Sequence, residues 1–101
     1  MSRETEHVLK TVARYWDAVK SGEKTFEVRR NDRAFQTGDT LLLRRTDEFG
    51  QSSPLPEDQG EGESILRKRV TYILQGGQFG IEPGVCVLGL GSLNRIEGVK
   101  E

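Results

Sequence analysis

Charged side chains of both signs crowd one stretch of the chain, residues 21–45, with the sequence SGEKTFEVRRNDRAFQTGDTLLLRR. Glu27 and Arg29 are two residues apart there, so on a strand they leave the same face about 7 Å apart. A carboxylate accepts hydrogen bonds from the exocyclic amine of a base, and a guanidinium offers a fork to phosphate or a plane for stacking. Lys24 can reach a phosphate as a mobile point charge. The spacing permits a two-part grip on one phosphate-bearing ligand.

The same charges also have a simpler interpretation. Glu27 and Arg29 can form an ordinary surface or half-buried ion pair, which contributes little to stability. Arg30 and Arg33 can flank a backbone phosphate, but charges near a turn are usually only solvated. Charge pattern alone favours this second interpretation.

Other residues with chemical potential do not form a comparable cluster. His7 is the only histidine and has no cysteine or histidine companion, so neither a zinc site nor a catalytic triad is expected. Cys86 lies among valines and leucines and is predicted to be a buried, unreactive thiol. Tyr15, Trp16 and Tyr72 can stack on bases, but we expect them in the core.

The composition indicates one small cytoplasmic domain. The chain has 101 residues, of which 34% are hydrophobic and 31% charged, enough for a single core of polar character. It has no apolar run of the roughly 18 residues that span a membrane, and acids replace the apolar stretch of a signal peptide. A single cysteine fits a reducing compartment.

The net charge of −1 argues weakly against a general nucleic-acid binder, but the charges are unevenly spread. Residues 47–63 carry six acids and no Lys or Arg, whereas most arginines lie in or beside predicted strands. A net charge near zero is therefore compatible with a basic face on one side of the molecule and an acidic loop on the other.

A helix is predicted just before the charged stretch. Four apolar positions recur at i, i+3, i+4 and i+7: Val12, Tyr15, Trp16 and Val19. Thr11 is a plausible N-cap, Lys20 suits the last turn, and Gly22 can take the left-handed position that ends the helix. A short strand, residues 7–10, precedes it.

Strands separated by turns make up the rest. KTFEVRR alternates, with Phe26 and Val28 on one face and Glu27 and Arg29 on the other. TLLLRR, SILRKRVTYIL and VCVLGLGSL are further strands, residues 46–63 a long mobile loop, and residues 95–101 a frayed tail. The prediction is an α+β single domain with its core at about 7–93, a small barrel of five or six mostly antiparallel strands and one main helix near the N-terminus.

The spacing Gly22-x-Lys24-x-x-Glu27-x-Arg29 resembles the GxKxxExR signature of the ASCH domains, a branch of the PUA-like β-barrels. A helix precedes the motif, and TGDTLLL follows it, like the Gly-Asp turn that leads into a family strand. With VTYILQGGQFGI and VLGLG, residues 7–91 resemble a small bacterial and phage subgroup. A Tyr-Thr-Gly-Arg-like segment expected before the long strand is replaced here by EGESILRKR.

The resemblance implies a PUA-like barrel with a cleft beside the helix that binds RNA or a nucleotide-like ligand. The expected ligand-binding residues are Gly22, Lys24, Glu27 and Arg29, with Arg30 and Arg33 as peripheral phosphate contacts. No cofactor, metal or membrane partner is expected, and nothing specifies an oligomeric state.

Two alternatives remain open. Some ASCH relatives are small amidohydrolases that deacetylate a modified cytidine with a Lys, a Thr and a Glu. Lys24 matches that Lys, but Glu27 occupies the position of the Thr nucleophile; an enzyme would use Lys24 with Glu27 or Glu63 to move the proton. We expect a binding protein instead. The other alternative is a protein-interaction module that uses the acidic loop and has no nucleic-acid role.

Overall fold

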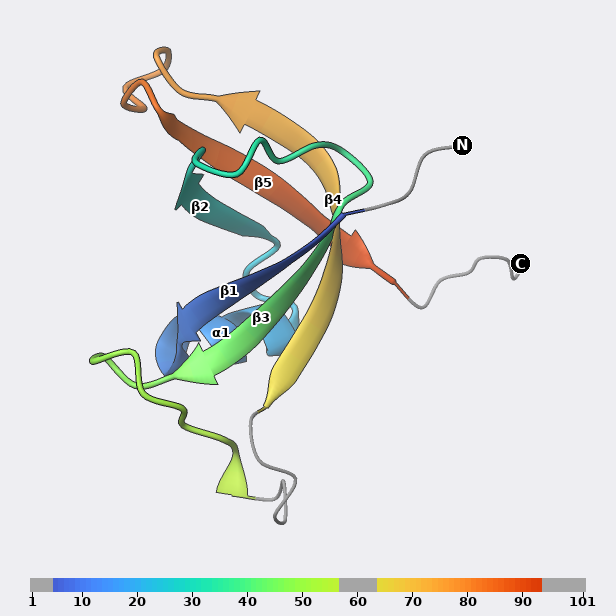
Figure 1. The fold of residues 1–101 in the computed structure, drawn as a ribbon, viewed down its shortest axis with the longest axis vertical. Coiled ribbons are helices and arrows are strands. Elements are labelled where there is room, and N and C mark those ends of the chain that lie inside the picture. Colours follow the sequence, from blue (N-terminus) through green and yellow to red (C-terminus); the bar gives the residue numbers. More distant parts are fainter. Residues whose placement is uncertain (1–4, 57–63, 94–101) are drawn as a thin grey trace.

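A single curled sheet dominates the structure, a computed structural model that describes residues 5–56 and 64–93 (Figure 1). The elements are β1 (Glu6–Val12), α1 (Ala13–Ser21), β2 (Phe26–Arg30), β3 (Thr40–Thr46), β4 (Ile65–Gln75) and β5 (Val85–Ser92). The strand order is β1-β3-β4-β5-β2, in which only the β1–β3 pair is parallel. The predicted α+β fold, a small half-barrel of mostly antiparallel strands with one helix, is confirmed within the described residues.

The helix ends as predicted but begins differently. Gly22 adopts a left-handed conformation with φ of 91°, and its N–H donates to Val19 O at 3.1 Å, as expected for a C-terminal glycine. Lys20 lies in the last turn. The prediction of Thr11 as N-cap is wrong, because β1 continues to Val12 and Val12 itself takes the N-cap position without a side-chain hydrogen bond.

The core lies on the concave side of the sheet, where α1 closes one end beside β1 and β3. Its buried hydrophobic members are Leu9, Trp16, Val19, Phe35, Leu41, Leu43, Val70, Cys86 and Leu88. Trp16 also donates its indole N–H to Leu43 O at 2.7 Å, which fixes the helix against β3. Cys86 is buried as predicted, and burial raises the pKa of its thiol.

Tyr72 does not lie in the core, and that prediction is wrong. Its side chain is 66% exposed, because the register of β4 against β5 shifts between Val70 and Tyr72. Such an irregularity inserts an extra residue, so positions that alternation would place on one face end up on opposite faces. Val70 therefore packs inside, whereas Tyr72 faces outward.

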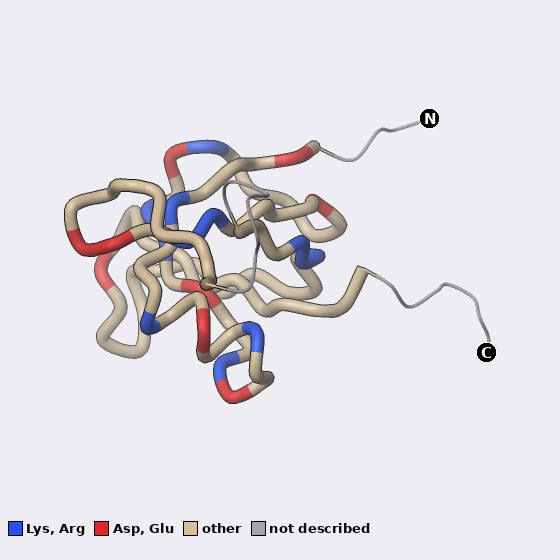
Figure 2. The backbone as a smooth tube through the Cα atoms, turned by 90° about the horizontal axis from the view of Figure 1, so that it is seen from below, with Lys and Arg blue, Asp and Glu red and all other residues tan. Residues whose placement is uncertain are grey.

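Part of the predicted loop at 46–63 is ordered by local hydrogen bonds. Thr46 still belongs to β3, and one carboxylate oxygen of Asp47 accepts from the N–H groups of Phe49 and Gln51 at 2.8 and 2.9 Å. Residues 57–63 of that loop and the predicted tail, residues 95–101, lie outside the described residues. Figure 2 shows basic and acidic positions interspersed along the described backbone. No helix in residues 5–56 and 64–93 has the length and apolar character to cross a membrane.

Candidate functional site

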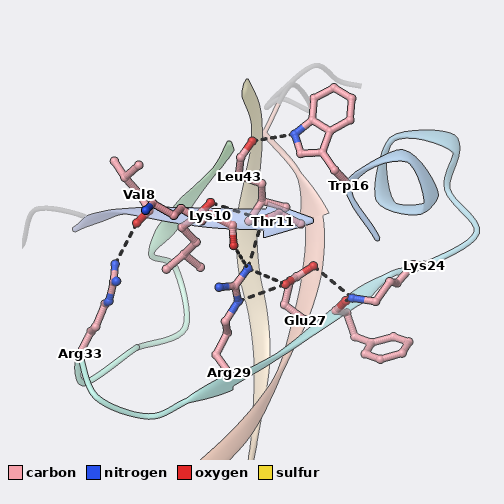
Figure 3. A network of polar contacts seen from close by, with 11 residues as sticks. Val8, Lys10, Thr11, Trp16, Lys24, Glu27, Arg29, Arg33 and Leu43 are labelled. Atoms are coloured by element: carbon pink, nitrogen blue, oxygen red, sulfur yellow. Dashed lines mark hydrogen bonds and ion pairs between the residues drawn. The ribbon is translucent and has the colours of Figure 1, made fainter. Parts of the chain in front are cut away.

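The two edge strands of the half-barrel, β1 and β2, face each other across a gap that side chains bridge. Arg29 donates from Nη2 to Lys10 O, and Arg33 donates from Nη1 to Val8 O, both at 3.0 Å (Figure 3). We call this gap the seam, defined by residues 8–12 of β1 on one side and by residues 26–33, β2 and the turn after it, on the other. Val8 and Lys10 are two residues apart on β1. Their carbonyls therefore point to the same side of the strand, into the seam. Two guanidinium groups therefore occupy the place where a closed barrel would have backbone hydrogen bonds between β1 and β2.

A hollow of about 540 Å³ opens at the seam beside α1. Its walls include three residues of the predicted motif, namely Lys24, Glu27 and Arg29. The same hollow is lined by Lys10 and Thr11 of β1 and by Tyr15 of α1. Three side chains of the predicted binding set therefore meet at one concave place.

Glu27 is the central group of this hollow. The residue is only 3% exposed, whereas its strand neighbours Phe26 and Val28 are 42% and 52% exposed. The charged face of β2 is thus the inner face, since Glu27 lies opposite the buried Leu88 of β5. Glu27 and Arg29 do form the ion pair of the simpler interpretation, in its half-buried form, since the carboxylate is buried and Arg29 is partly exposed.

Two cations hold the buried carboxylate from either side. Glu27 Oε2 accepts from Lys24 Nζ at 3.1 Å, and Oε1 accepts from Nε and Nη2 of Arg29 at 3.1 and 3.0 Å (Figure 3). Arg29 Nη2 also contacts the hydroxyl of Thr11 at 3.1 Å. A buried charge requires such compensation, because an uncompensated one is strongly destabilising.

Hydrogen-bonding capacity is left over at the site. A carboxylate offers about four acceptor positions, and the contacts described fill three of them, so one remains on Glu27 Oε2. Lys24 has three donors and uses two, on Phe26 O and Glu27. In the described part of the chain Nη1 of Arg29 makes no hydrogen bond, and Figure 3 shows it pointing away from Glu27. The hollow can therefore both donate and accept hydrogen bonds.

The hollow is positively charged and partly aromatic. Its charged lining consists of Lys10, Lys24, Arg29 and Glu27, a formal balance of +2. Lys24 Nζ lies 5.5 Å from the ring centroid of Tyr15 and 4.8 Å from that of Phe26. The prediction of Tyr15 as a core residue is wrong, since it is 44% exposed: one step of about 100° around the helix separates it from the buried Trp16.

The remaining predicted site residues have other positions. Gly22 does not line the hollow; it ends α1 and lets the chain return so that the N–H of Lys24 bonds Ala18 O at 3.0 Å. Arg30 and Arg33 line a second, smaller hollow of about 210 Å³. Glu63, the proton carrier of the hydrolase alternative, lies outside the described residues.

Sequence reasoning missed the contribution of β1. Lys10 and Thr11 are far from the motif in sequence, and only the curl of the sheet brings them to Arg29. It also missed a partner for His7, whose Nε2 lies 2.8 Å from Asp39 Oδ2 with both residues buried. Asp39 accepts the N–H of Gln36 as well, so the pair fastens the turn before β3 to β1. Among the described residues no group of three or more His, Cys, Asp or Glu is placed to hold a metal ion.

Comparison with known families gives one match. A family model described as "Domain of unknown function (DUF3850)" matches residues 6–90, which include β1, the motif strand and most of β5. No curated protein matches the chain.

Proposed function

We propose that this chain, which belongs to the family of DUF3850 domains, binds RNA or a nucleotide-like ligand in the hollow at the seam. The observation that supports this most is the placement of Glu27, which is 3% exposed yet borders a hollow of net positive charge. The buried carboxylate of Glu27 pairs with both Lys24 and Arg29, and this fixes where the two cationic groups point. Cations held in this way are preorganised for an anion and lose little freedom on binding.

Each group at the hollow has a role in the proposal. Arg29 Nη1, the third N–H of Lys24 and the exposed ammonium of Lys10 contact phosphate oxygens. The rings of Tyr15 and Phe26 provide apolar surfaces for a base, on which stacking is tolerant of base identity. The spare acceptor of Glu27 Oε2 receives one N–H from the exocyclic amine or ring of that base.

We also propose that the chain is related to the ASCH domains of the PUA-like superfamily. This is supported by the Gly22-x-Lys24-x-x-Glu27-x-Arg29 spacing and by the location of the hollow beside the helix that precedes the motif. Gly22 takes part as a backbone residue that positions Lys24, and Arg30 and Arg33 remain peripheral phosphate contacts.

The amidohydrolase alternative has less support from the geometry. It needs a nucleophile beside a general base. The aliphatic hydroxyl that lines the hollow, that of Thr11, donates to Leu9 O at 3.3 Å and accepts from Arg29. Lys24 and Glu27 are engaged with each other. For the interaction-module alternative, the described part of the acidic loop offers Asp47, which accepts hydrogen bonds from its own loop, and Glu48, whose exposed carboxylate pairs with Arg14 at 2.9 Å, a pair of little energetic weight.

A filter-binding assay tests the proposal with a short single-stranded RNA at two salt concentrations. Wild type should bind at low salt and release as salt increases, because phosphate contacts are salt-dependent. Arg29→Ala should bind more weakly, whereas Arg67→Ala, which removes an equal charge from β4, should bind as wild type does. Absence of binding by wild type at low salt, or equal binding by Arg29→Ala, would contradict the proposal.

A further inference from the structure

We infer that the ligand is a single-stranded oligoribonucleotide of at least two nucleotides, which follows the seam and places successive units in two hollows on either side of Arg29. This rests on the proposed function and specifies its ligand class. A mononucleotide would use only the first hollow.

The second hollow adjoins the first through one shared residue. Its lining is Leu9, Arg29, Arg30, Asp32, Arg33 and Phe35, and Arg29 belongs to both linings. Leu9 and Phe35 are buried and give this hollow an apolar floor, whereas the other four residues form a charged rim. An apolar floor with a basic rim suits a sugar or base with its phosphate at the edge.

Two cationic groups are anchored next to each other along the seam. Arg29 and Arg33 reach the carbonyls of Lys10 and Val8, which are two residues apart on β1 and hence about 7 Å apart. Both guanidinium groups are therefore anchored on the same strand, β1. Two anchored cations in a row match a chain of phosphates better than a single anion.

Charge balance supports the same conclusion. The second hollow adds Arg30 and Arg33 to the shared Arg29, against Asp32 at 3.6 Å from Arg33, so the two linings together have a formal balance of +3. Adjacent hollows of the same sign repel each other in the free protein, and a polyanion that crosses both relieves this repulsion. Strands β1 and β2 thus form a positively charged track on either side of Arg29.

The aromatic part of the site favours a single strand over a duplex. Stacking on Tyr15 or Phe26 requires a base whose face is free. In a duplex both faces of an internal base are already covered by its neighbours.

Calorimetric titration with uridine 5′-monophosphate and with 5′-phosphorylated diuridylate tests the inference. We expect wild type to bind the dinucleotide about tenfold more tightly than the mononucleotide, as for one added charge-assisted contact. Arg33→Ala should reduce this ratio to about two or less. The matched control Arg67→Ala, on the central strand β4, should preserve it. If circular dichroism shows Arg33→Ala unfolded, Arg30→Ala, whose exposed side chain lines only the second hollow, replaces it with the same expected reduction.

Three results would overturn the inference. Equal affinity of wild type for both probes would leave the proposed function standing and confine the ligand to one hollow. An RNA duplex that binds as tightly as the single strand of the same length would exclude a single-stranded ligand class. Failure of wild type to bind either probe or a longer single strand would end the proposed function along with the inference.

Discussion

The carboxylate of Glu27 and the guanidinium of Arg29 meet through two hydrogen bonds, from Nε at 3.1 Å and from Nη2 at 3.0 Å, on the inner face of β2. Nη2 of Arg29 also donates a hydrogen bond to Lys10 O of β1. A single side chain therefore compensates a buried charge, links the two edge strands and leaves Nη1 directed away from Glu27 (Figure 3). Stability and ligand binding are coupled at this residue, and the predictions below separate the two.

Neutralising Glu27 should destabilise the fold. In Glu27→Gln, Lys24 and Arg29 lose the anion between them while remaining partly buried. We expect the free energy of unfolding to decrease by about 3 kcal/mol, as when one partner of a buried ion pair is removed. Urea unfolding measures this. The control is Glu48→Gln, whose carboxylate is 71% exposed in its pair with Arg14, and which should change stability by less than about 1 kcal/mol. Equal effects of the two substitutions would contradict the central role of Glu27.

Replacing Arg29 by lysine should weaken ligand binding more than it weakens folding. Arg29→Lys retains a positive charge beside Glu27 but loses the planar fork that holds Glu27 through Nε and Nη2 and leaves Nη1 for the ligand. We expect affinity for a short single-stranded RNA to decrease about tenfold, measured by fluorescence anisotropy. A lysine variant with wild-type affinity would show that only the charge at this position matters.

Removing the ring of Tyr15 should cost binding energy without affecting the core. Tyr15 is 44% exposed at the hollow, so Tyr15→Leu leaves the packing of Trp16 and Val19 in place. Loss of one stacked base amounts to about 1–3 kcal/mol. Tyr72→Leu provides the matched control, because Tyr72 is 66% exposed and outside the lining of both hollows. Similar affinities of the two variants would exclude stacking on Tyr15.

The Cys86 thiol should be unreactive in the folded protein and should make stability depend on pH at the alkaline end. Burial raises the pKa of this thiol above its ordinary value, so the folded state disfavours the thiolate. This contribution to stability is fully present below the unfolded pKa and is lost as the pH rises through it toward the folded pKa. We expect slow reaction with Ellman's reagent at pH 8 and fast reaction in urea. The free energy of unfolding of Cys86→Ala should therefore decrease less between pH 8 and pH 10 than that of the wild type.

Incubation with acetylated cytidine should give no product. Thr11, whose hydroxyl lines the hollow, is 2% exposed and donates to Leu9 O, so among the described residues its proton is directed at a carbonyl and not at a general base. Chromatography after prolonged incubation at high protein concentration measures the outcome. Release of acetate that is lost in Lys24→Ala would establish the amidohydrolase instead.

The sequence predicted the elements well because local signals specify them. Gly22 ends α1 as its position after Lys20 indicates, and the alternation of β2 and the length of β4 follow from side-chain patterning. Prediction from the sequence failed at residues whose position depends on contacts with distant parts of the chain. Thr11 has the chemistry of an N-cap but is held in β1 by pairing with β3, and the register shift after Val70 turned Tyr72 outward.

The candidate site was only half predictable for the same reason. The motif places Lys24, Glu27 and Arg29 together because they are close in sequence, and the structure brings them to one hollow. Which face of β2 lies inside depends on the curl of the whole sheet, so alternation alone did not reveal that Glu27 is buried and Phe26 exposed. The curl also brings Lys10 to Arg29, 19 residues away.

Titration of isotope-labelled protein with a short single-stranded RNA, followed by NMR, tests most directly whether the hollow at the seam is a binding site. We predict that the largest chemical-shift changes occur at Lys10, Tyr15, Lys24, Glu27 and Arg29, which line that hollow, and that they saturate at low salt. Signals of Glu48 and Arg67 should remain unchanged. Changes confined to residues 47–56, or no changes at any concentration of RNA, would contradict the account.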